Sequence, residues 1–208
     1  MNMTPNGLHL LIAFFALAVM AWLFWLKPRW RGWLFSFVTE HVAATRAPDF
    51  IIGGKDRPYI QRWWVIPRNR LFNIYLHCVL RDDDDRALHD HPWFNLSIVM
   101  AGGYWEETPR GRHWRRPGSV VLRSPWARHR LELEKHYDHA VVGFTDGMPI
   151  FESLPAWTLF ITGPKIRIWG FWCQQKDGDE RFVKWSDFVD PNDPGAVGPG
   201  CDQPEVRS

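Results

Sequence analysis

Short apolar runs alternate with turn residues through the middle of the chain, between residues 58 and 185. Runs of this length that are separated by Gly, Pro, Asn and Asp are typical of β-strands joined by turns. We expect strands at residues 59–66, 72–81, 95–100, 104–107, 119–123, 130–134, 157–162 and 167–172. Several short strands at this spacing predict an all-β sandwich or barrel, and they disfavour a parallel sheet with crossover helices.

The composition fits one folded domain with appendages, because the chain has 208 residues and 46% of them are hydrophobic. An aromatic content of 15% and a net charge of only +2 exclude a chain that is disordered throughout. The 14 tryptophans indicate a membrane interface, a stacking surface or a very aromatic core. Cys78, Cys173 and Cys201 are too few and too scattered for a disulfide framework, and we expect Cys201 to be a free thiol.

A membrane anchor is predicted near the N-terminus. Residues 7–26 read GLHLLIAFFALAVMAWLFWL and contain no charged side chain. A helix of this length rises roughly 30 Å, which is enough to cross the hydrocarbon core of a bilayer. Lys27, Arg29 and Arg31 follow at once, so the positive-inside rule places the rest of this single-pass protein in the cytoplasm. A cleaved signal peptide and a buried core helix are the alternatives, but the segment lacks a basic start and a small-residue cleavage site.

The predicted organisation has four parts. Residues 1–27 form the transmembrane anchor, 28–57 a short amphipathic helix and linker, 58–189 the barrel, and 190–208 a disordered tail. The amphipathic helix lies along the lipid headgroups or packs onto the domain, and membrane lipid is the expected partner of residues 7–33. Residues 136–155 predict a long hairpin or insertion, and Ser186 is the expected N-cap of a short helix.

Three histidines carry the chemistry that the sequence predicts. His89 and His91 are two residues apart, and alternate residues of a strand point to the same face, so they offer two imidazoles to one metal ion. His129 is the best candidate for the third ligand. His77 lies in an alternating strand, where it is a fourth ligand, a pocket acid or a hydrogen-bonded core histidine. The alternative for the whole group is a barrel in which the histidines hold no metal and are simply hydrogen-bonded.

The spacing of these histidines resembles that of the cupin superfamily of small β-barrels. Its first motif, GX5HXHX3–4EX6G, is similar to the run from His89 through Asn95 to Gly102, with Asn in place of Glu. Its second motif, GX5PXGX2HX3N, requires the eleven-residue separation that lies between Gly118 and His129. The second match departs from the motif at three positions, which are Pro125, Trp126 and Leu133. The resemblance covers approximately residues 58–172.

This resemblance implies a cupin-like β-barrel, or double-stranded β-helix, that holds a divalent metal through His89, His91 and His129. The missing Glu leaves a three-histidine face similar to that of the thiol dioxygenases, which hold Fe(II) without a carboxylate. Asn95 is then a weak or indirect ligand. Neutral imidazoles also suit Zn, Ni and Cu. The implied enzyme is a non-haem iron dioxygenase, an oxidoreductase whose metal keeps open positions for substrate and O₂.

An arginine-rich segment, residues 110–130, contains no acidic residue. Its seven arginines are Arg110, Arg112, Arg115, Arg116, Arg123, Arg128 and Arg130. The segment has three interpretations: it holds a small anionic substrate, it lies on anionic lipid, or it binds nucleic acid. Nucleic acid ranks last because the net charge is close to zero. If the strand alternates regularly, Arg123 shares a face with His129 and is the expected substrate cation.

The alternative to the enzyme is a non-catalytic, membrane-associated binding module. In that case the barrel is a scaffold, and residues 110–130 recognise a lipid or a protein partner through their arginines and tryptophans.

Overall fold

The computed structural model describes residues 28–54, 57–83, 87–134, 141–145, 148–151, 154–175, 178–190 and 198–202. The predicted anchor over residues 1–27 lies outside these residues. Within the described part of the chain, no helix is both long enough and apolar enough to cross a membrane.

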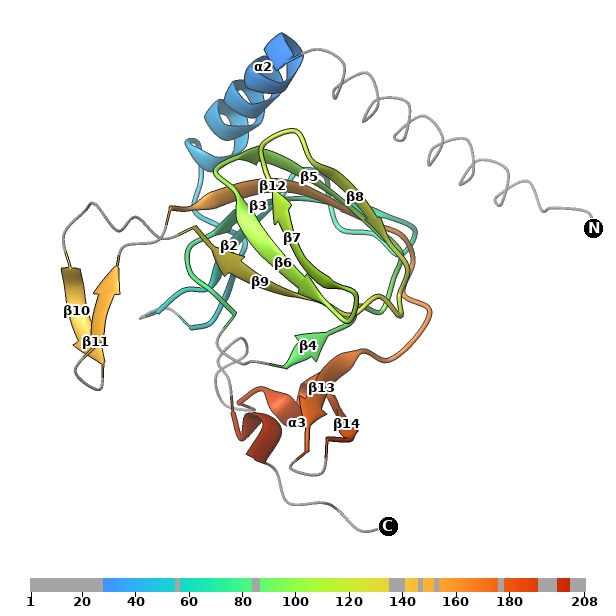
Figure 1. Cartoon of the computed structure of the whole chain (residues 1–208). Helices are drawn as coiled ribbons and strands as arrows, with labels where there is room; N and C mark the ends of the chain where they lie inside the picture. The colour runs from blue at the N-terminus through green and yellow to red at the C-terminus, as the bar shows by residue number, and fades with distance from the viewer. Residues whose placement is uncertain are drawn as a thin grey trace, which may run out of the picture.

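Antiparallel sheets form the body of the molecule, and the largest has the order β1-β2-β3-β12-β5-β8 (Figure 1). Its strands are β1 (Phe50–Ile52), β2 (Ile60–Trp64), β3 (Asn73–Val79), β12 (Ala156–Thr162), β5 (Asn95–Ala101) and β8 (Val120–Arg123). A second sheet has the order β7-β6-β9, with β6 (Tyr104–Thr108), β7 (Gly111–Arg115) and β9 (Arg130–Leu133). Together they confirm the predicted all-β, barrel-like architecture.

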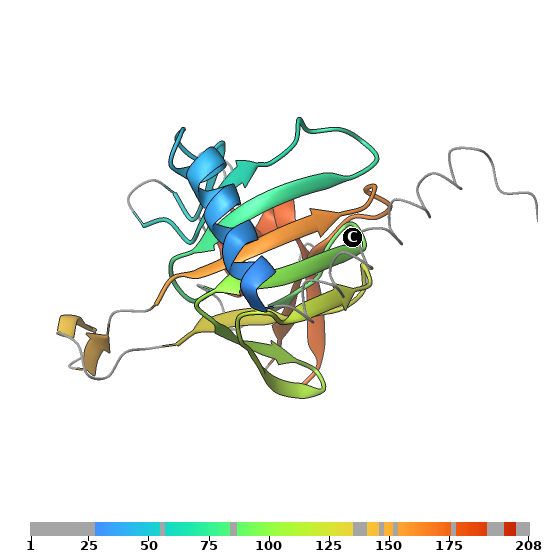
Figure 2. The same ribbon diagram turned by 90° about the horizontal axis from the view of Figure 1, so that it is seen from above.

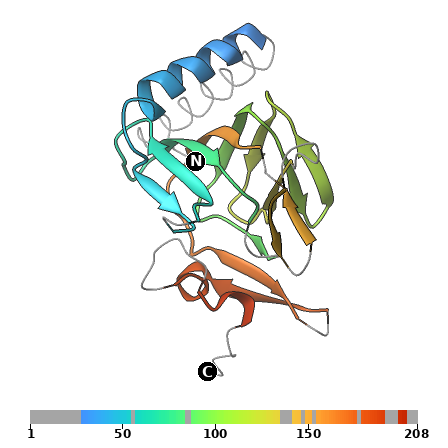
Figure 3. The same cartoon turned by 90° about the vertical axis from the view of Figure 1, so that its left-hand side faces the viewer.

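A third sheet and a hairpin extend from this barrel. The third sheet has the order β14-β13-β4, with β4 (Leu88–His89), β13 (Gly170–Gln174) and β14 (Glu180–Lys184), and it lies below the barrel in Figure 3. The hairpin of β10 (Val141–Thr145) and β11 (Met148–Phe151) projects to one side in Figure 1. The hairpin interpretation of residues 136–155 is therefore confirmed where the structure describes that segment.

The outer face of the six-stranded sheet is covered by helix α2 (Pro28–Val38), which continues into the π-helical turn η1 (Thr39–Ala43). Figure 2 shows α2 lying obliquely across the strands. Val38 is buried in one apolar cluster with Trp63 and Leu76, and Phe35 packs against that cluster. Of the two positions expected for the amphipathic helix, the structure has the one that packs onto the domain.

The inner face of the sheet supports the functional site. Because side chains alternate along a strand, Leu76 of β3 points to the helix-covered core while His77 and Val79 point into the barrel. A separate inner apolar cluster closes part of the barrel; its buried members are Ile60, Val79, Val99, Tyr104, Leu133 and Ala156.

The C-terminal region departs from the sequence-based expectations. Cys201 forms a disulfide with Cys173 of β13, so the prediction that Cys201 is a free thiol is wrong. The Arg181 side chain donates a hydrogen bond from Nη2 to the carbonyl of Cys201 (2.7 Å), which also holds this segment. The sequence pattern near each residue does not predict the disulfide, because Cys173 and Cys201 are 28 residues apart.

Helix α3 (Trp185–Phe188) forms where a short helix was predicted, but its N-cap is Lys184, so the assignment of Ser186 to that position is wrong. Predicted strand 167–172 begins only at Gly170. The preceding residues form a loop that is held by a hydrogen bond from the Ile166 amide to the Pro92 carbonyl (2.8 Å). The strands β1, β4, β7 and β14 were not predicted.

Candidate metal centre

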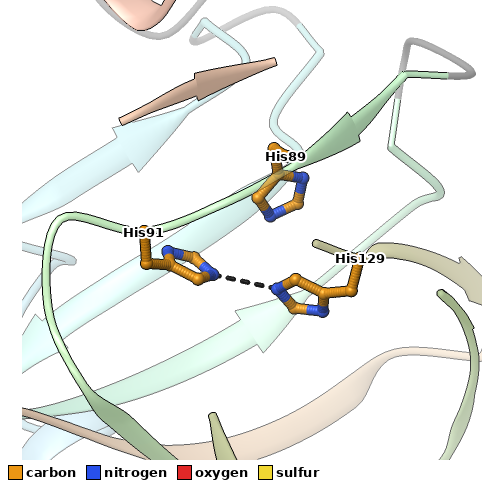
Figure 4. Close-up of side chains that lie close together, drawn as sticks. All are labelled: His89, His91 and His129. Atoms are coloured by element: carbon orange, nitrogen blue, oxygen red, sulfur yellow. Dashed lines mark hydrogen bonds between the residues drawn. The ribbon is translucent and has the colours of Figure 1, made fainter. Parts of the chain in front are cut away.

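The three predicted histidines come together through a short backbone bridge. His89 ends β4, and His129 directly precedes β9. The amide of each donates a hydrogen bond to the carbonyl of the other, both at 2.9 Å. His91 lies two residues beyond His89, and Figure 4 shows the three imidazole rings facing one another.

The ring nitrogens form a group that could hold one metal ion. One ligand nitrogen from each histidine lies within 4.8 Å of the others. Nε2 of His91 and Nε2 of His129 are 2.9 Å apart. Two nitrogens at adjacent positions of an octahedral metal, each bound at about 2.1 Å, would be about 3.0 Å apart. The donor set therefore fits a divalent transition metal, as the resemblance to cupins implied.

Glu106 of β6 orients one of these ligands. Its carboxylate is 1% exposed, and Oε1 lies 3.0 Å from Nδ1 of His129. A carboxylate in this position favours the tautomer with the proton on Nδ1, which leaves Nε2 free to bind metal. Asp83 makes a longer contact with His89, because its Oδ2 lies 3.7 Å from Nδ1 of that ring.

The environment keeps the buried histidines neutral. Burial and the nearby charge of Arg123 lower the pKa of His129 to about 3, although Glu106 acts in the opposite direction. Burial and the neighbouring histidines hold the pKa of His91 well below its ordinary value. Neutral imidazole is the form that binds a metal, so both side chains have their ligand nitrogens available near neutral pH.

Arg123 lines the same cavity as His129, as strand alternation predicted, but its charge has a protein partner. Its Nε donates a hydrogen bond to Oε1 of Glu106 (2.7 Å). Asn95 contacts this arginine, since its Oδ1 lies 3.4 Å from Nη1 of Arg123. The roles predicted for Arg123 and Asn95 as substrate cation and weak ligand remain predictions; in the structure Arg123 contacts Glu106, and Asn95 contacts Arg123.

Burial opposes ionisation of Glu106, but the close approach of His129 and the charge of Arg123 outweigh it, so the pKa of Glu106 lies well below its ordinary value. Arg115 adds a second guanidinium contact, with Nε 2.6 Å from Oε2. Sequence reasoning missed Glu106, although a single acid at an inward position of the predicted strand 104–107 was an available signal.

Asp90 ties the histidine segment to the third sheet. This residue is fully buried and accepts hydrogen bonds from the Gly170 amide (3.0 Å) and from Nε1 of Trp172 (3.1 Å). Nη1 of Arg167 lies 2.7 Å from Oδ2, the oxygen that also accepts the hydrogen bond from Trp172, and compensates the charge. Since Asp90 stands between His89 and His91, these contacts fix the backbone that carries both imidazoles.

A cavity of about 500 Å³ opens beside the histidines. Its walls are mostly apolar and aromatic, and they include Tyr104, Phe160, Trp169, Phe171 and Phe188. The cavity also reaches polar residues on the inner face of the barrel, which are Arg62, His77, Ser97 and Thr158. Mostly apolar cavities of this size with a few polar groups are typical of small-molecule sites.

The arginine-rich segment 110–130 is largely compensated by carboxylates from neighbouring strands. Five of its seven arginines form ion pairs, in the combinations Arg112–Glu132, Arg115–Glu106, Arg123–Glu106, Arg128–Glu180 and Arg130–Glu107. The segment therefore offers much less uncompensated charge to a lipid or a nucleic acid than the sequence alone indicated.

The chain is similar to several solved structures. No family model and no curated protein matches the chain. Solved structures with a similar fold include the DMSP lyase DddQ of Ruegeria pomeroyi, at 12% identity and a TM-score of 0.39 over 60% of this chain and 59% of that one. An RmlC-like cupin of Ralstonia eutropha is similar at 13% identity and a TM-score of 0.36, over 62% of this chain and 69% of that one. The EutQ protein of Clostridium difficile is similar at 6% identity and a TM-score of 0.35, over 51% of this chain and 68% of that one.

Proposed function

We propose that this protein is a membrane-anchored, cupin-like protein that binds a divalent metal ion, first of all Fe(II), through His89, His91 and His129. The convergence of these three imidazoles in the wall of a cavity carries the proposal. A face of three neutral nitrogens leaves other metal positions open for a substrate, as a catalytic site requires.

We propose further that the activity is that of a non-haem iron dioxygenase acting on a small anionic substrate. Bound Fe(II) would supply the ability to react with O₂. Glu106 keeps the proton on Nδ1 of His129 and so holds the ring in one orientation. The aromatic walls formed by Phe160, Trp169 and Phe171 exclude bulk water, which strengthens polar contacts to a bound substrate.

Oxygen uptake tests this activity. The full chain, purified in detergent and loaded with Fe(II) under anaerobic conditions, is mixed with oxygenated buffer and a panel of carboxylic acids. The account predicts substrate-dependent O₂ consumption that is lost in His91→Ala and kept in His113→Ala, whose imidazole is exposed on β7. Iron-loaded protein that consumes no O₂ with any acid would contradict the dioxygenase assignment and leave a metal-binding module.

Membrane anchoring through residues 7–26 is a separate part of the proposal. The side chains of Trp33 and Phe37 support it, because both are exposed on α2, and their rings stack at 5.4 Å just after the apolar segment. Deletion of residues 1–27 should release the protein from membranes in a flotation assay. A truncated protein that still floats with the vesicles would contradict the anchor.

The proposed orientation, with the barrel in the cytoplasm, rests on Lys27, Arg29 and Arg31. The Cys173–Cys201 disulfide weighs against it, because disulfides persist mainly in oxidising compartments. Alkylation of thiols in intact cells before lysis distinguishes the two sides. A cytoplasmic barrel predicts that both cysteines are alkylated, and recovery of the pair as a disulfide would place the barrel on the opposite side.

A further inference from the structure

Arg62 lies in the cavity, on the inner face of β2. Its Nε donates a hydrogen bond to Nε2 of His77 on β3 (2.8 Å), and its guanidinium carbon lies 4.9 Å from the centre of the Tyr75 ring. The register of the two strands explains this contact, since Arg62 stands directly opposite His77. The pair therefore forms a polar subsite on the inner face of the barrel, where Thr158 and Ser97 also line the cavity.

Among the residues that the structure describes, no carboxylate lies within ion-pair distance of Arg62, whereas Arg123 in the same cavity is paired with Glu106. His77 does not compensate the charge of Arg62, because an imidazole carries no negative charge near neutral pH. Burial and the charge of Arg62 keep the pKa of His77 well below the ordinary value, so the ring is neutral. Burial lowers the pKa of Arg62 to about 10, so the guanidinium is still protonated near neutral pH.

Arg62 is partly buried in the cavity, and a charge that is removed from water without a partner is costly, so such charges are normally paired. We propose that Arg62, positioned by His77, binds the carboxylate of an amphipathic monocarboxylic acid whose apolar body fills the rest of the cavity. The proposal rests on the proposed function, in which the substrate is anionic, and it names the group that recognises it. It assigns the anchoring role to Arg62 in place of Arg123.

The geometry of the guanidinium favours a carboxylate. Nε of Arg62 is occupied by His77, which leaves the two Nη groups to face a ligand. Two parallel N–H donors match the two oxygens of a carboxylate. A single uncompensated positive charge also suits a monoanion better than a phosphate dianion, which would need a second cation.

The position of the subsite relates the carboxylate to the metal centre. The ring of Phe160 lies between the two groups, with its centre 5.1 Å from that of His77 and 5.8 Å from that of His91. An acid bound at Arg62 would therefore extend over Phe160 toward the histidines. A cavity of about 500 Å³ also exceeds what a two- or three-carbon acid would fill, so the ligand carries an apolar chain or ring.

Binding of phenylacetate and of its isosteric neutral amide, phenylacetamide, tests the proposal. Titration calorimetry uses the full chain in nanodiscs after removal of metal with a chelator. The wild type should bind phenylacetate at least about tenfold more tightly than phenylacetamide. Arg62→Gln should remove this preference, while the matched control Arg68→Gln, at an exposed arginine beside Trp64, should keep it.

Either of two results would overturn the proposal: a wild type that binds acid and amide equally, or an Arg62→Gln variant that keeps the preference. The wild-type comparison tests whether the cavity prefers an anion, and if Arg62→Gln does not fold, Arg62→Lys tests whether Arg62 confers that preference. Arg62→Lys keeps the positive charge but lacks the two parallel N–H donors of the guanidinium. It should retain a reduced preference for phenylacetate. Phenylacetate preference in a wild type that held no metal before the chelator step, although it was purified from iron-supplemented cells, would contradict the proposed metal function and leave the Arg62 subsite standing.

Discussion

Oε1 of Glu106 lies 3.0 Å from Nδ1 of His129, and the same oxygen accepts a hydrogen bond from Nε of Arg123 at 2.7 Å. One buried acid therefore orients a candidate metal ligand and neutralises a buried cation. This double role explains why a carboxylate is placed in the interior of the barrel, where an unpaired charge would be costly.

Glu106→Gln should weaken both functions. The amide no longer compensates Arg123, so the free energy of unfolding should fall by about 3–5 kcal/mol. Loss of the carboxylate behind His129 should lower the metal affinity about 10–100-fold. Chemical denaturation and competition with a chelating dye measure the two effects separately.

The matched control is Glu107→Gln on the same strand, because Glu107 is partly exposed and pairs with Arg130. Its effect on stability should be less than about 1 kcal/mol, and its metal affinity should be unchanged. Equal metal affinities in Glu106→Gln and in the wild type would show that the carboxylate does not support the site.

His77 gives the metal-free protein a pH-dependent stability. Burial and Arg62 hold its pKa in the folded state well below the ordinary value of 6.5, so the unfolded chain binds a proton that the folded one does not. The stabilisation is present above about pH 6.5 and is lost as the pH falls below it, by about 1.4 kcal/mol per pH unit. Urea denaturation between pH 7 and pH 5 should give a shallower slope for His77→Phe than for the wild type. Identical slopes would mean that His77 is protonated in the folded state.

Helix α2 should behave as part of the domain. Val38 is 5% exposed against the sheet, whereas the adjacent Phe37 is 45% exposed. Val38→Asp buries an unpaired charge and should destabilise the protein by more than about 4 kcal/mol. Phe37→Asp should cost less than about 1.5 kcal/mol, mainly through the ring contacts that it loses. Similar unfolding midpoints for the two variants would contradict the packing of α2 on the sheet.

The Cys173–Cys201 disulfide closes a loop of 28 residues and should stabilise the protein by about 3–4 kcal/mol in the chain-entropy account. Cys201→Ser should therefore lower the thermal midpoint, and a reducing agent should lower that of the wild type but not that of the variant. A wild-type midpoint that is insensitive to reduction would argue against the bond in solution.

Much of the fold and the ligand set could be predicted because their signals are local. Alternation and turn residues mark most strands within two residues of their observed ends, as for β3 and β12. The two-residue spacing of His89 and His91 also fixes their common direction. His129 was predicted as the third ligand and also fits the motif spacing, and the backbone bridge to His89 is the physical reason that the two residues meet.

The contacts that the sequence did not indicate depend on the register between strands that are distant in the chain. Glu106 reaches His129 because β6 pairs with β9, with Glu106 opposite Leu131. Arg62 faces His77 through the pairing of β2 with β3. No periodicity within one strand reports these partners, so the sequence indicated Arg123 as the available cation and left Arg62 unnoticed. The cysteine pair was missed for the same reason.

Metal content is the measurement that tests the central claim most directly. The full chain is purified in detergent from iron-supplemented cells under reducing, anaerobic conditions, beside the variants His129→Ala and His113→Ala. The account predicts about one equivalent of divalent metal in the wild type and in His113→Ala, and almost none in His129→Ala. Folded wild-type protein without metal, or equal metal in all three proteins, would contradict a site formed by His89, His91 and His129.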